Sequence, residues 1–319
     1  MKQININEIQ GFFIGHAQNE QAATGCTAIL CPAGATAGVD VRGGSPASRE
    51  TELLRPVNTV EQIHAVMLSG GSAFGLAAGD GAMAYLEEKG IGFDVGIGRV
   101  PIVCGASLFD LQIGDFSTRP DKAMGYAACQ QAAQNCPKEG NVGAGTGATV
   151  GKLHGMAGAM KAGLGLYAAQ VGPVQVGAVV AVNALGDVID FDTKQILAGL
   201  RTEEGFGDTV QTLYQEMEDT RSLWSGNTTI GCVITNARLT KSQCNKLASI
   251  AQNGLAQTIH PVHSTADGDT VFVLSKGEVE ANVDALGALM TECMARAINR
   301  AVTQAAPAYG LPAAGSVEG

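Results

Sequence analysis

The sequence lacks an excess of basic residues. Its 319 residues include 20 lysines and arginines against 30 aspartates and glutamates, a formal net charge of −10, and no stretch concentrates the basic side chains. Nucleic acids and anionic membrane surfaces are bound mostly by basic patches. The charge balance therefore argues against both as the main partner.

Long apolar runs are also absent. No segment approaches the roughly 18 uninterrupted apolar residues that indicate a membrane span. The first ten residues, MKQININEIQ, lack the apolar run of a signal peptide. We therefore expect a cytoplasmic protein. In that compartment Asn227, which begins an Asn-Thr-Thr sequence, would not be a glycosylation site.

Metal-binding spacing is missing as well. The eight cysteines include no CxxC pair and no Cys/His pair at zinc-finger spacing, so we expect free thiols. His260 and His263 in IHPVH form an HxxH match, for which a structural or hydrogen-bonding role is favoured over a metal. We expect neither a metal nor an organic cofactor.

Glycine, by contrast, is abundant. The 43 glycines indicate many turns and close backbone contacts, in a chain long enough for one large α/β domain or two small ones. GNVGAGTGATVGK at 140–152 suggests a phosphate loop, but Thr146 stands where the Walker pattern requires glycine, and Leu153 follows Lys152. Nucleotide binding by this glycine loop is kept as an alternative.

Two strands are predicted to be buried. VVAVN at 179–183 is continuously apolar, as expected of a strand covered on both faces, and it ends at Asn183. Residues 228–236 alternate, and Thr228 lies on the same side as the apolar residues Ile230, Cys232 and Ile234.

Helices are predicted around these strands. Thr240 and Gln243 form a capping box at the start of one helix. Residues 270–275 predict another strand, and residues 279–302 a long amphipathic helix. Residues 69–90 read as a glycine-rich turn leading into a helix. The C-terminal third is therefore expected to run strand, helix, strand, helix.

Thr228 suggests chemistry. A threonine hydroxyl is a weak nucleophile unless a base lies within hydrogen-bond reach. If the Asn227–Thr228 bond is cut, the new α-amine, with an ordinary pKa of about 7.7 to 8, lies on the same residue as the hydroxyl. The hydroxyl can make the cut itself, by an N-to-O acyl shift onto the Asn227 carbonyl and hydrolysis of the ester. The alternative interpretation is a capped loop before a strand.

Six stretches together identify a family. The chain resembles the self-processing L-aminopeptidase/D-esterase family, which includes β-aminopeptidases and nylon-oligomer hydrolases and belongs among the N-terminal-nucleophile-like hydrolases. The matching stretches cover nearly the whole chain: VDVRGGSPASRETELL (39–54), LSGGSAFGLAAGDG (68–81), GNVGAGTGATVGK (140–152), VVAVNALGDVID (179–190), GNTTIGCVITNARLTKSQ (226–243) and PVHSTADGDTVFVLS (261–275).

The resemblance implies an α/β fold, a four-layer α/β/β/α sandwich. It implies a single hydrolase domain over residues 1–319, cleaved by itself into an α fragment, 1–227, and a β fragment, 228–319. It also implies a homo-oligomer of αβ protomers.

The resemblance further implies the catalytic residues. The nucleophile falls on Thr228, and the asparagine that donates to the oxyanion falls on Asn183, which by pattern alone is a turn residue. The lysine near the nucleophile falls on Lys152, by pattern alone a solvated side chain. Asp267 and Asp269 match the pair that supports cleavage and the nucleophile, although DGD is also an ordinary turn sequence.

The cleavage site implied by the resemblance joins Asn227 and Thr228. Gly71 and Ser72 lie in the loop expected to complete the substrate pocket. Phe109 stands where some members of the family carry a tyrosine, so a contact through a phenol hydroxyl is not expected here.

These inferences predict an autoproteolytic amide hydrolase that forms an acyl-enzyme on Thr228. Its substrates would be small amides or short peptides with a free amino group. Two rivals stand beside this prediction: a binding or scaffold protein of the same fold that never cleaves itself, and a nucleotide-binding enzyme that uses the 140–152 loop.

Overall fold

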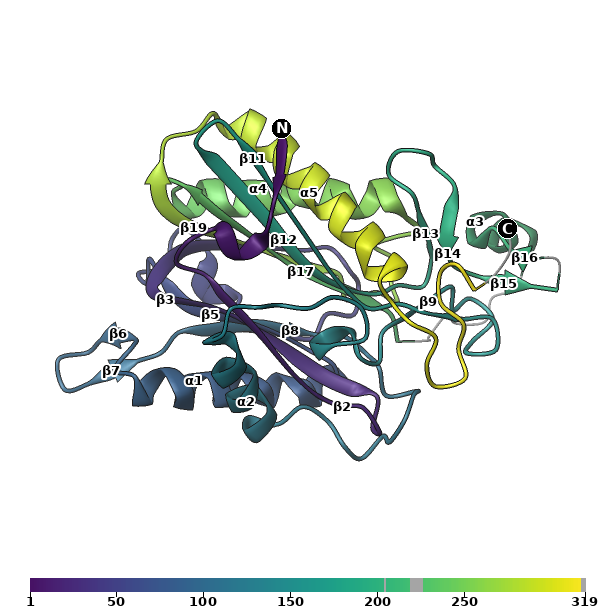
Figure 1. The fold of residues 1–319 in the computed structure, drawn as a ribbon, viewed down its shortest axis with the longest axis horizontal. Coiled ribbons are helices and arrows are strands. Elements are labelled where there is room, and N and C mark those ends of the chain that lie inside the picture. Colours follow the sequence, from purple (N-terminus) through teal and green to yellow (C-terminus); the bar gives the residue numbers. More distant parts are fainter. Residues whose placement is uncertain (204, 219–225, 317–319) are drawn as a thin grey trace.

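The structure is a computed structural model that describes residues 1–203, 205–218 and 226–316. Two β-sheets pack face to face, and helices cover the outer face of each (Figure 1). The predicted four-layer α/β/β/α sandwich is therefore confirmed.

The first sheet contains the strands that carry Asn183 and Thr228. Its order is β1 (Lys2–Ile4), β11 (Leu164–Val171), β12 (Val174–Asn183), β17 (Thr228–Ala237), β19 (Thr270–Val279) and β3 (Thr24–Val41). β17 and β19 are parallel, whereas the other neighbours are antiparallel.

The 18-residue strand β3 belongs to both sheets, because its first part pairs with β2 and β5 and its last part pairs with β19. The second sheet consists of β2 (Phe13–Asn19), β3, β5 (Ile63–Ser69), β8 (Val103–Ser107) and β4 (Ser48–Arg49). The small sheets are formed by β6 (Phe93–Asp94) with β7 (Arg99–Val100), β9 (Thr149–Val150) with β10 (Met160–Lys161), β13 (Asp187–Ile189) with β14 (Ile196–Ala198) and β18 (Ile259–His260), and β15 (Arg201–Thr202) with β16 (Gly205–Phe206).

Two pairs of helices form the outer layers. α4 (Lys241–Thr258) and α5 (Val283–Thr303) cover the first sheet, and α1 (Ala78–Glu88) and α2 (Lys122–Ala132) cover the second (Figure 1). The remaining helical segments are α3 (Thr209–Gln215), η1 (Ile6–Glu8), η2 (Glu52–Leu54), η3 (Ser72–Ala77) and η4 (Gly143–Gly145).

Three apolar clusters fill the three spaces between the layers. Val233 and Leu247 lie between the first sheet and its helices, Ile230 and Phe272 between the two sheets, and Leu86 between the second sheet and its helices. Each large apolar side chain buried in this way contributes about 1.5 to 3 kcal/mol relative to an exposed one. The four layers are held together mainly by these contacts.

Close packing explains much of the glycine content. A Cβ atom on Gly38 of β3 would lie 2.2 Å from the backbone nitrogen of Asn245 in α4. A Cβ atom on Gly165 of β11 would lie 1.9 Å from the Ala297 carbonyl oxygen in α5. Because real Cβ contacts are never so short, glycine is required where these helices press on the sheet.

The predicted elements are confirmed, with shifted boundaries. Thr240 and Gln243 form the expected capping box at the start of α4. The predicted helix 279–302 begins later, because β19 continues to Val279, where it pairs with β17, and the Asn282 side chain then caps α5 by accepting a hydrogen bond from Ala285. The predicted strand 179–183 is the last half of β12.

Candidate active site

The site lies where β12 and β17 lie side by side. Thr228 is the first residue of β17, and it is the register partner of Asn183, the last residue of β12. Both are buried. Ile230, on the same side of β17 as Thr228, belongs to the cluster between the two sheets, as its alternation predicted. Thr228 therefore stands at one end of the space between the sheets.

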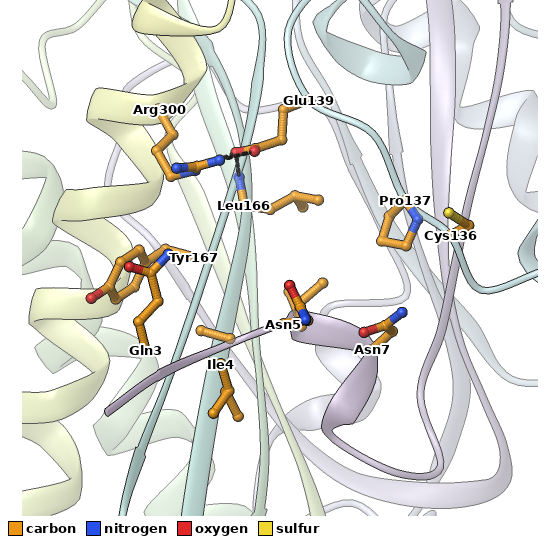
Figure 2. A pocket seen from close by; sticks show the side chains of 12 residues that line it. Gln3, Ile4, Asn5, Asn7, Cys136, Pro137, Glu139, Leu166, Tyr167 and Arg300 are labelled. Carbon is orange, nitrogen blue, oxygen red and sulfur yellow. Dashed lines mark hydrogen bonds and ion pairs between the residues drawn. The ribbon is translucent and has the colours of Figure 1, made fainter. Parts of the chain in front are cut away.

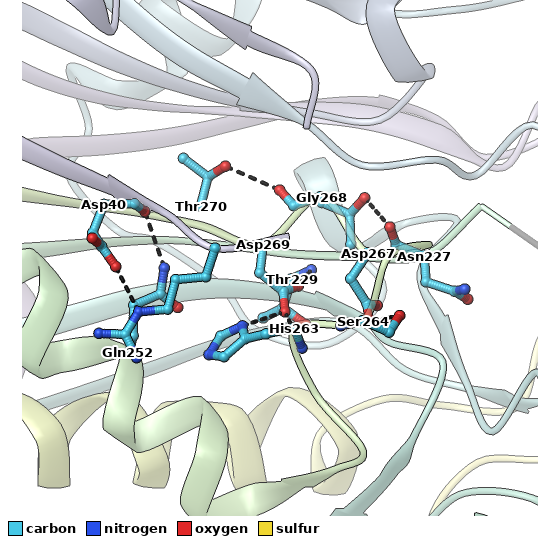
Figure 3. A network of polar contacts seen from close by, with 12 residues as sticks. Asp40, Asn227, Thr229, Gln252, His263, Ser264, Asp267, Gly268, Asp269 and Thr270 are labelled. Atoms are coloured by element: carbon cyan, nitrogen blue, oxygen red, sulfur yellow. Dashed lines mark hydrogen bonds and ion pairs between the residues drawn. The ribbon is translucent and has the colours of Figure 1, made fainter. Parts of the chain in front are cut away.

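The Thr228 hydroxyl contacts the peptide bond before it. Its Oγ1 donates a hydrogen bond to the carbonyl oxygen of Asn227. The same carbonyl oxygen accepts a hydrogen bond of 3.1 Å from the backbone N–H of Gly268 (Figure 3). A hydroxyl thus lies against a carbonyl group that a backbone donor already polarises.

The chain before this bond is tightly constrained. Gly226 has a φ of +66°, in the left-handed region that favours glycine. A Cβ atom at this position would lie 2.2 Å from the ring of Phe109. The Phe109 ring therefore sets the path of the backbone that leads to Asn227 and Thr228.

Lys152 is buried, which overturns the interpretation of a solvated side chain. Its ammonium donates to the backbone and side-chain oxygens of Asn183 at 3.0 and 2.9 Å, and to the Gly226 carbonyl at 3.1 Å. Burial lowers the pKa of Lys152 to about 7, although Asp267 and Asp110 oppose the shift. Near neutral pH this amine is therefore present in both protonation states.

Asn183 also binds the Gly226 carbonyl. Its Nδ2 donates to the Phe109 carbonyl at 2.9 Å and to the Gly226 carbonyl at 3.4 Å, while its Oδ1 accepts from the backbone of Thr149 at 3.0 Å. The amide is held by strand and loop partners on both sides. Asn183 is thus a buried, oriented donor, and not a turn residue exposed to solvent.

The two aspartates of DGD have different partners (Figure 3). Asp269 accepts from the backbone N–H of Thr229 at 2.7 Å and from the backbone and Nδ1 of His263 at 3.1 and 2.8 Å. Asp267 accepts from the backbone of Ser264 at 2.9 Å and from its hydroxyl. Burial, and then the neighbouring Asp269, raise the pKa of Asp267. Asp269 therefore anchors the residue after Thr228.

The pocket beside Thr228 is small, with a volume of about 90 Å³. Its lining residues come from five separate stretches of the chain: Ser45, Ala47, Ser72, Ser107, Phe109, Gly226, Asn227, Thr228 and Ala266. Ser72 and Phe109 are among these lining residues. Gly71 is not among the lining residues, and its backbone N–H donates to Asp110 at 2.7 Å.

Several polar residues of the site were not assigned to it from the sequence. His263, for which a structural or hydrogen-bonding role was favoured, and Ser264 lie four and three residues before Asp267, and this proximity was the available signal. Ser107 ends β8, and its buried hydroxyl has no hydrogen-bond partner within the described residues. Burial raises the pKa of Asp110, which anchors Gly71 and the Thr24 hydroxyl, to about 6.

The glycines of the 140–152 loop serve packing. A Cβ atom on Gly147 would lie 2.0 Å from the Ala23 carbonyl oxygen, and one on Gly145 would lie 2.1 Å from the Leu164 nitrogen. The loop is buried from Gly143 to Lys152, all of which the structure describes. It offers no open cradle for a phosphate, and its lysine contacts Asn183 instead.

A larger cavity lies elsewhere, at the edge strand β1. Its volume is about 250 Å³, and it shares no lining residue with the Thr228 pocket (Figure 2). Its one ion pair joins Arg300 to Glu139, and the Glu139 carboxylate also accepts from the backbone of Leu166 at 2.8 Å. These charges are already satisfied by each other and by the sheet.

Metal-binding and membrane-spanning features are absent from residues 1–203, 205–218 and 226–316. No three His, Cys, Asp or Glu side chains gather there in a way that could hold a metal ion. No helix in this part is both long and apolar enough to cross a membrane. All eight cysteines are free thiols, as predicted, and only Cys136 is exposed.

Comparisons with known proteins show what the chain is similar to. The chain matches the description "Peptidase family S58" over residues 5–314. It is 40% identical to an uncharacterized aminopeptidase of Mycobacterium leprae (strain TN), over 97% of this chain and 92% of that protein. It is 30% identical to the 6-aminohexanoate-oligomer endohydrolase of Agromyces sp. (strain KY5R), over 90% of this chain and 82% of the relative.

A solved structure shares the fold. The L-aminopeptidase D-Ala-esterase/amidase of Ochrobactrum anthropi, described as a variant of the Ntn hydrolase fold, superposes with a TM-score of 0.69 at 18% identity. The match covers 94% of this chain and 86% of that one.

Proposed function

Because the chain belongs to peptidase family S58 and is an amide-hydrolysing enzyme of the aminopeptidase type, we propose that Thr228 is its nucleophile and that the first bond it cleaves is its own Asn227–Thr228 bond. The observation that carries this proposal is the Thr228 hydroxyl donating to the Asn227 carbonyl, which Gly268 also holds.

In the first step, Thr228 Oγ1 attacks the carbonyl carbon of Asn227. Negative charge develops on the carbonyl oxygen, where the Gly268 N–H stabilises it. The Thr228 nitrogen leaves with a proton, and an ester joins Asn227 to the threonine oxygen. Water then hydrolyses the ester, which gives an Asn227 carboxylate and a Thr228 bearing both a free amine and its hydroxyl.

Cleavage also frees two donors. In the uncleaved chain, Lys152 Nζ and Asn183 Nδ2 both bind the Gly226 carbonyl. Once residues before the cut withdraw, both donors are available beside Thr228 for the carbonyl oxygen of a substrate. The uncleaved chain thus occupies its own substrate site, in agreement with a pocket of only about 90 Å³.

In the mature enzyme, the Thr228 α-amine takes the proton of the hydroxyl while Oγ1 attacks the substrate carbonyl. The protonated amine then gives this proton to the leaving amine, and water removes the acyl group from Thr228. The Lys152 ammonium, when charged, lowers the pKa of a nearby α-amine and keeps it available as a base. Asp269 holds the start of β17 still through Thr229.

The substrates are small amides or short peptides with a free amino group. The relatives support this class, because their names describe aminopeptidases and a hydrolase of 6-aminohexanoate oligomers. We also propose a homo-oligomer of αβ protomers in the cytoplasm. Light scattering at micromolar concentration tests the assembly, and a monomeric mass would refute it.

Denaturing mass spectrometry of the freshly purified protein tests the mechanism. We expect two fragments, residues 1–227 and 228–319, and an N-terminal sequence of TTIGCV for the second. Thr228→Ala should leave one uncleaved chain without hydrolytic activity. Thr229→Ala, which removes the neighbouring hydroxyl, is the matched control and should still mature.

Other outcomes favour the rivals. A wild-type chain that stays intact for days and is inert to amine-terminated amides would indicate the scaffold protein. A rise in melting temperature with ATP or NAD would indicate nucleotide binding. Hydrolysis that survives in Thr228→Ala would exclude the proposed nucleophile.

A further inference from the structure

A second hollow is lined by the same helical segment that carries Ser72. Ser72 is the first residue of η3 and lines the Thr228 pocket, whereas Phe74 and Ala77 of the same helix line a hollow of about 360 Å³. The rest of this second hollow comes from the stretch 117–121. The segment η3 therefore lines both hollows.

Among the described residues that line this second hollow, Arg119 is the only basic one. Its guanidinium carbon lies 3.9 Å from the ring centre of Phe74 and 5.6 Å from that of Phe116. Both rings are more than half exposed, at 55% and 58%. Stacking on aromatic faces fixes the plane of a guanidinium while leaving the N–H groups at its edge accessible.

The donors of Arg119 are largely unused. Its hydrogen bond within the described residues is a long one, 3.4 Å, to the Phe116 carbonyl, and no carboxylate there forms an ion pair with it. A guanidinium has five N–H donors, arranged to bind a carboxylate through two parallel hydrogen bonds.

The two nearby aspartates are engaged elsewhere. Asp115 accepts from the backbone and hydroxyl of Ser117 and from the hydroxyl of Thr118, at 2.7 to 2.9 Å. Asp121 caps α2 by accepting from Met124 at 2.8 Å. Within the part of the chain that the structure describes, Arg119 is thus an oriented cation that forms no ion pair. The pKa of the Asp115 carboxyl is lowered chiefly by the hydrogen bond from Thr118 and only to a smaller extent by the charge of Arg119. The protein's net charge of −10 repels anions in general.

We propose that Arg119 binds the terminal carboxylate of the substrate's leaving group, and that Phe74 supports the apolar part of the same group. This subsite rests on the proposed hydrolysis at Thr228. It gives the enzyme a preference for peptides and ω-amino acid oligomers with a free carboxyl terminus over the same compounds with a terminal amide.

The position of Arg119 suits a short leaving group. The side chains of Pro120 and Arg119 pack on Gly71, where a Cβ atom would lie 2.9 Å from the proline Cδ and 3.2 Å from the Arg119 Cβ. The stretch that carries the cation therefore contacts the turn just before Ser72. Because this turn leads directly into Ser72 of the Thr228 pocket, the carboxyl end of a short leaving group can lie near Arg119.

Matched substrate pairs test this subsite. Alanyl-glycyl-glycine and its C-terminal amide form one pair, and the linear dimer of 6-aminohexanoate and its amide form the other. We expect wild-type kcat/KM to favour the free acid about tenfold or more, as for other charge-assisted hydrogen bonds. Arg119→Met should remove this preference by slowing hydrolysis of the acids alone, and Arg119→Lys should keep a part of it.

The control is Arg55→Met, which removes the same charge from an exposed arginine outside both hollows. It should leave the preference unchanged. An equal loss on acid and amide in Arg119→Met would overturn the proposal, because it would indicate a purely structural contact with Phe74.

Two measurements do not depend on the variant. Equal wild-type rates on acid and amide would refute the subsite while leaving the Thr228 mechanism intact, whereas the failure of the wild type to hydrolyse either compound would count against the mechanism itself. Inhibition by glycyl-glycine should likewise exceed that by glycyl-glycinamide about tenfold, and equal inhibition would also refute the subsite.

Discussion

Lys152 and Lys161 are both fully buried lysines, and burial lowers the pKa of each to about 7. Lys161 donates to the carbonyls of Gly145, Ala148 and Ala162, all within its own part of the fold. Lys152 instead donates across the molecule to Asn183 and Gly226. A shifted pKa is common to both, so the partners, and not the pKa, distinguish the two lysines.

The partners of Lys161 are permanent, whereas one partner of Lys152 leaves in the proposed cleavage. The Gly226 carbonyl precedes the Asn227–Thr228 bond and would withdraw with the α fragment that the proposed cleavage produces. We therefore assign Lys161 to the stability of the glycine loop and Lys152 to the reaction. Substitutions at both positions test this division.

The largest effect is expected for Lys152→Met. Loss of a buried donor beside the reacting carbonyl should lower kcat of the mature enzyme by about 100-fold or more. Steady-state hydrolysis of an amine-terminated amide, with active sites counted by the amount of β fragment, measures it. Lys246→Met, at an exposed position on α4, is the control. A loss of activity under tenfold would place Lys152 outside the reaction.

Next in size is the effect of Lys161→Met on stability. Buried carbonyls of the loop lose their donor, and each unsatisfied polar group costs about 1 to 3 kcal/mol, so we expect a net loss on the order of 3 kcal/mol. Urea unfolding of the Thr228→Ala chain, with and without this second substitution, measures it. A variant of unchanged stability but reduced turnover would reverse the roles of the two lysines.

This contrast shows what the sequence could and could not predict. Individual strands and helices followed from periodicity, because alternation in β17 and the capping box before α4 are local signals, whereas the four layers were expected only from the family resemblance. Lys152 was assigned to catalysis only through the family resemblance, since by pattern alone it would have been taken for a solvated side chain. No sequence pattern indicated a role for Lys161. Whether a lysine is buried depends on distant segments packing around it, which no local pattern records.

The same limit applies to the carboxylates and to Gly226. DGD indicates that Asp267 and Asp269 form a turn or a catalytic pair. Only the fold shows that His263 donates a hydrogen bond to Asp269 and Ser264 donates one to Asp267. The left-handed conformation of Gly226 is set by the Phe109 ring, which lies more than one hundred residues away in sequence.

A smaller effect should follow from Gly226→Ala. This substitution changes the residue whose carbonyl binds Lys152 before the proposed cleavage. The new Cβ would clash with Phe109 at a positive φ, so the carbonyl should move away from both Lys152 and Asn183. We expect self-cleavage to slow about tenfold, equivalent to about 1.4 kcal/mol in the barrier. A time course of intact mass after synthesis measures the rate. Once mature, the variant should hydrolyse substrates within about twofold of wild type, and a larger defect would mean that Gly226 stays in the site.

Stability of the unprocessed chain should also depend on pH, and there both lysines should behave alike. The unfolded chain holds a proton on each lysine up to about pH 10.5, whereas the folded, unprocessed chain releases it near pH 7. Between these values the unfolded state binds more protons, so the free energy of unfolding rises with pH, by up to about 1.4 kcal/mol per pH unit for each lysine. Urea unfolding of the Thr228→Ala chain at pH 7, 8 and 9 measures this slope. Lys152→Met and Lys161→Met should each remove one lysine's share, and Lys246→Met should remove neither. A slope that only Lys161→Met reduces would mean that Lys152 is solvated before cleavage, and the comparison between two buried lysines would fail.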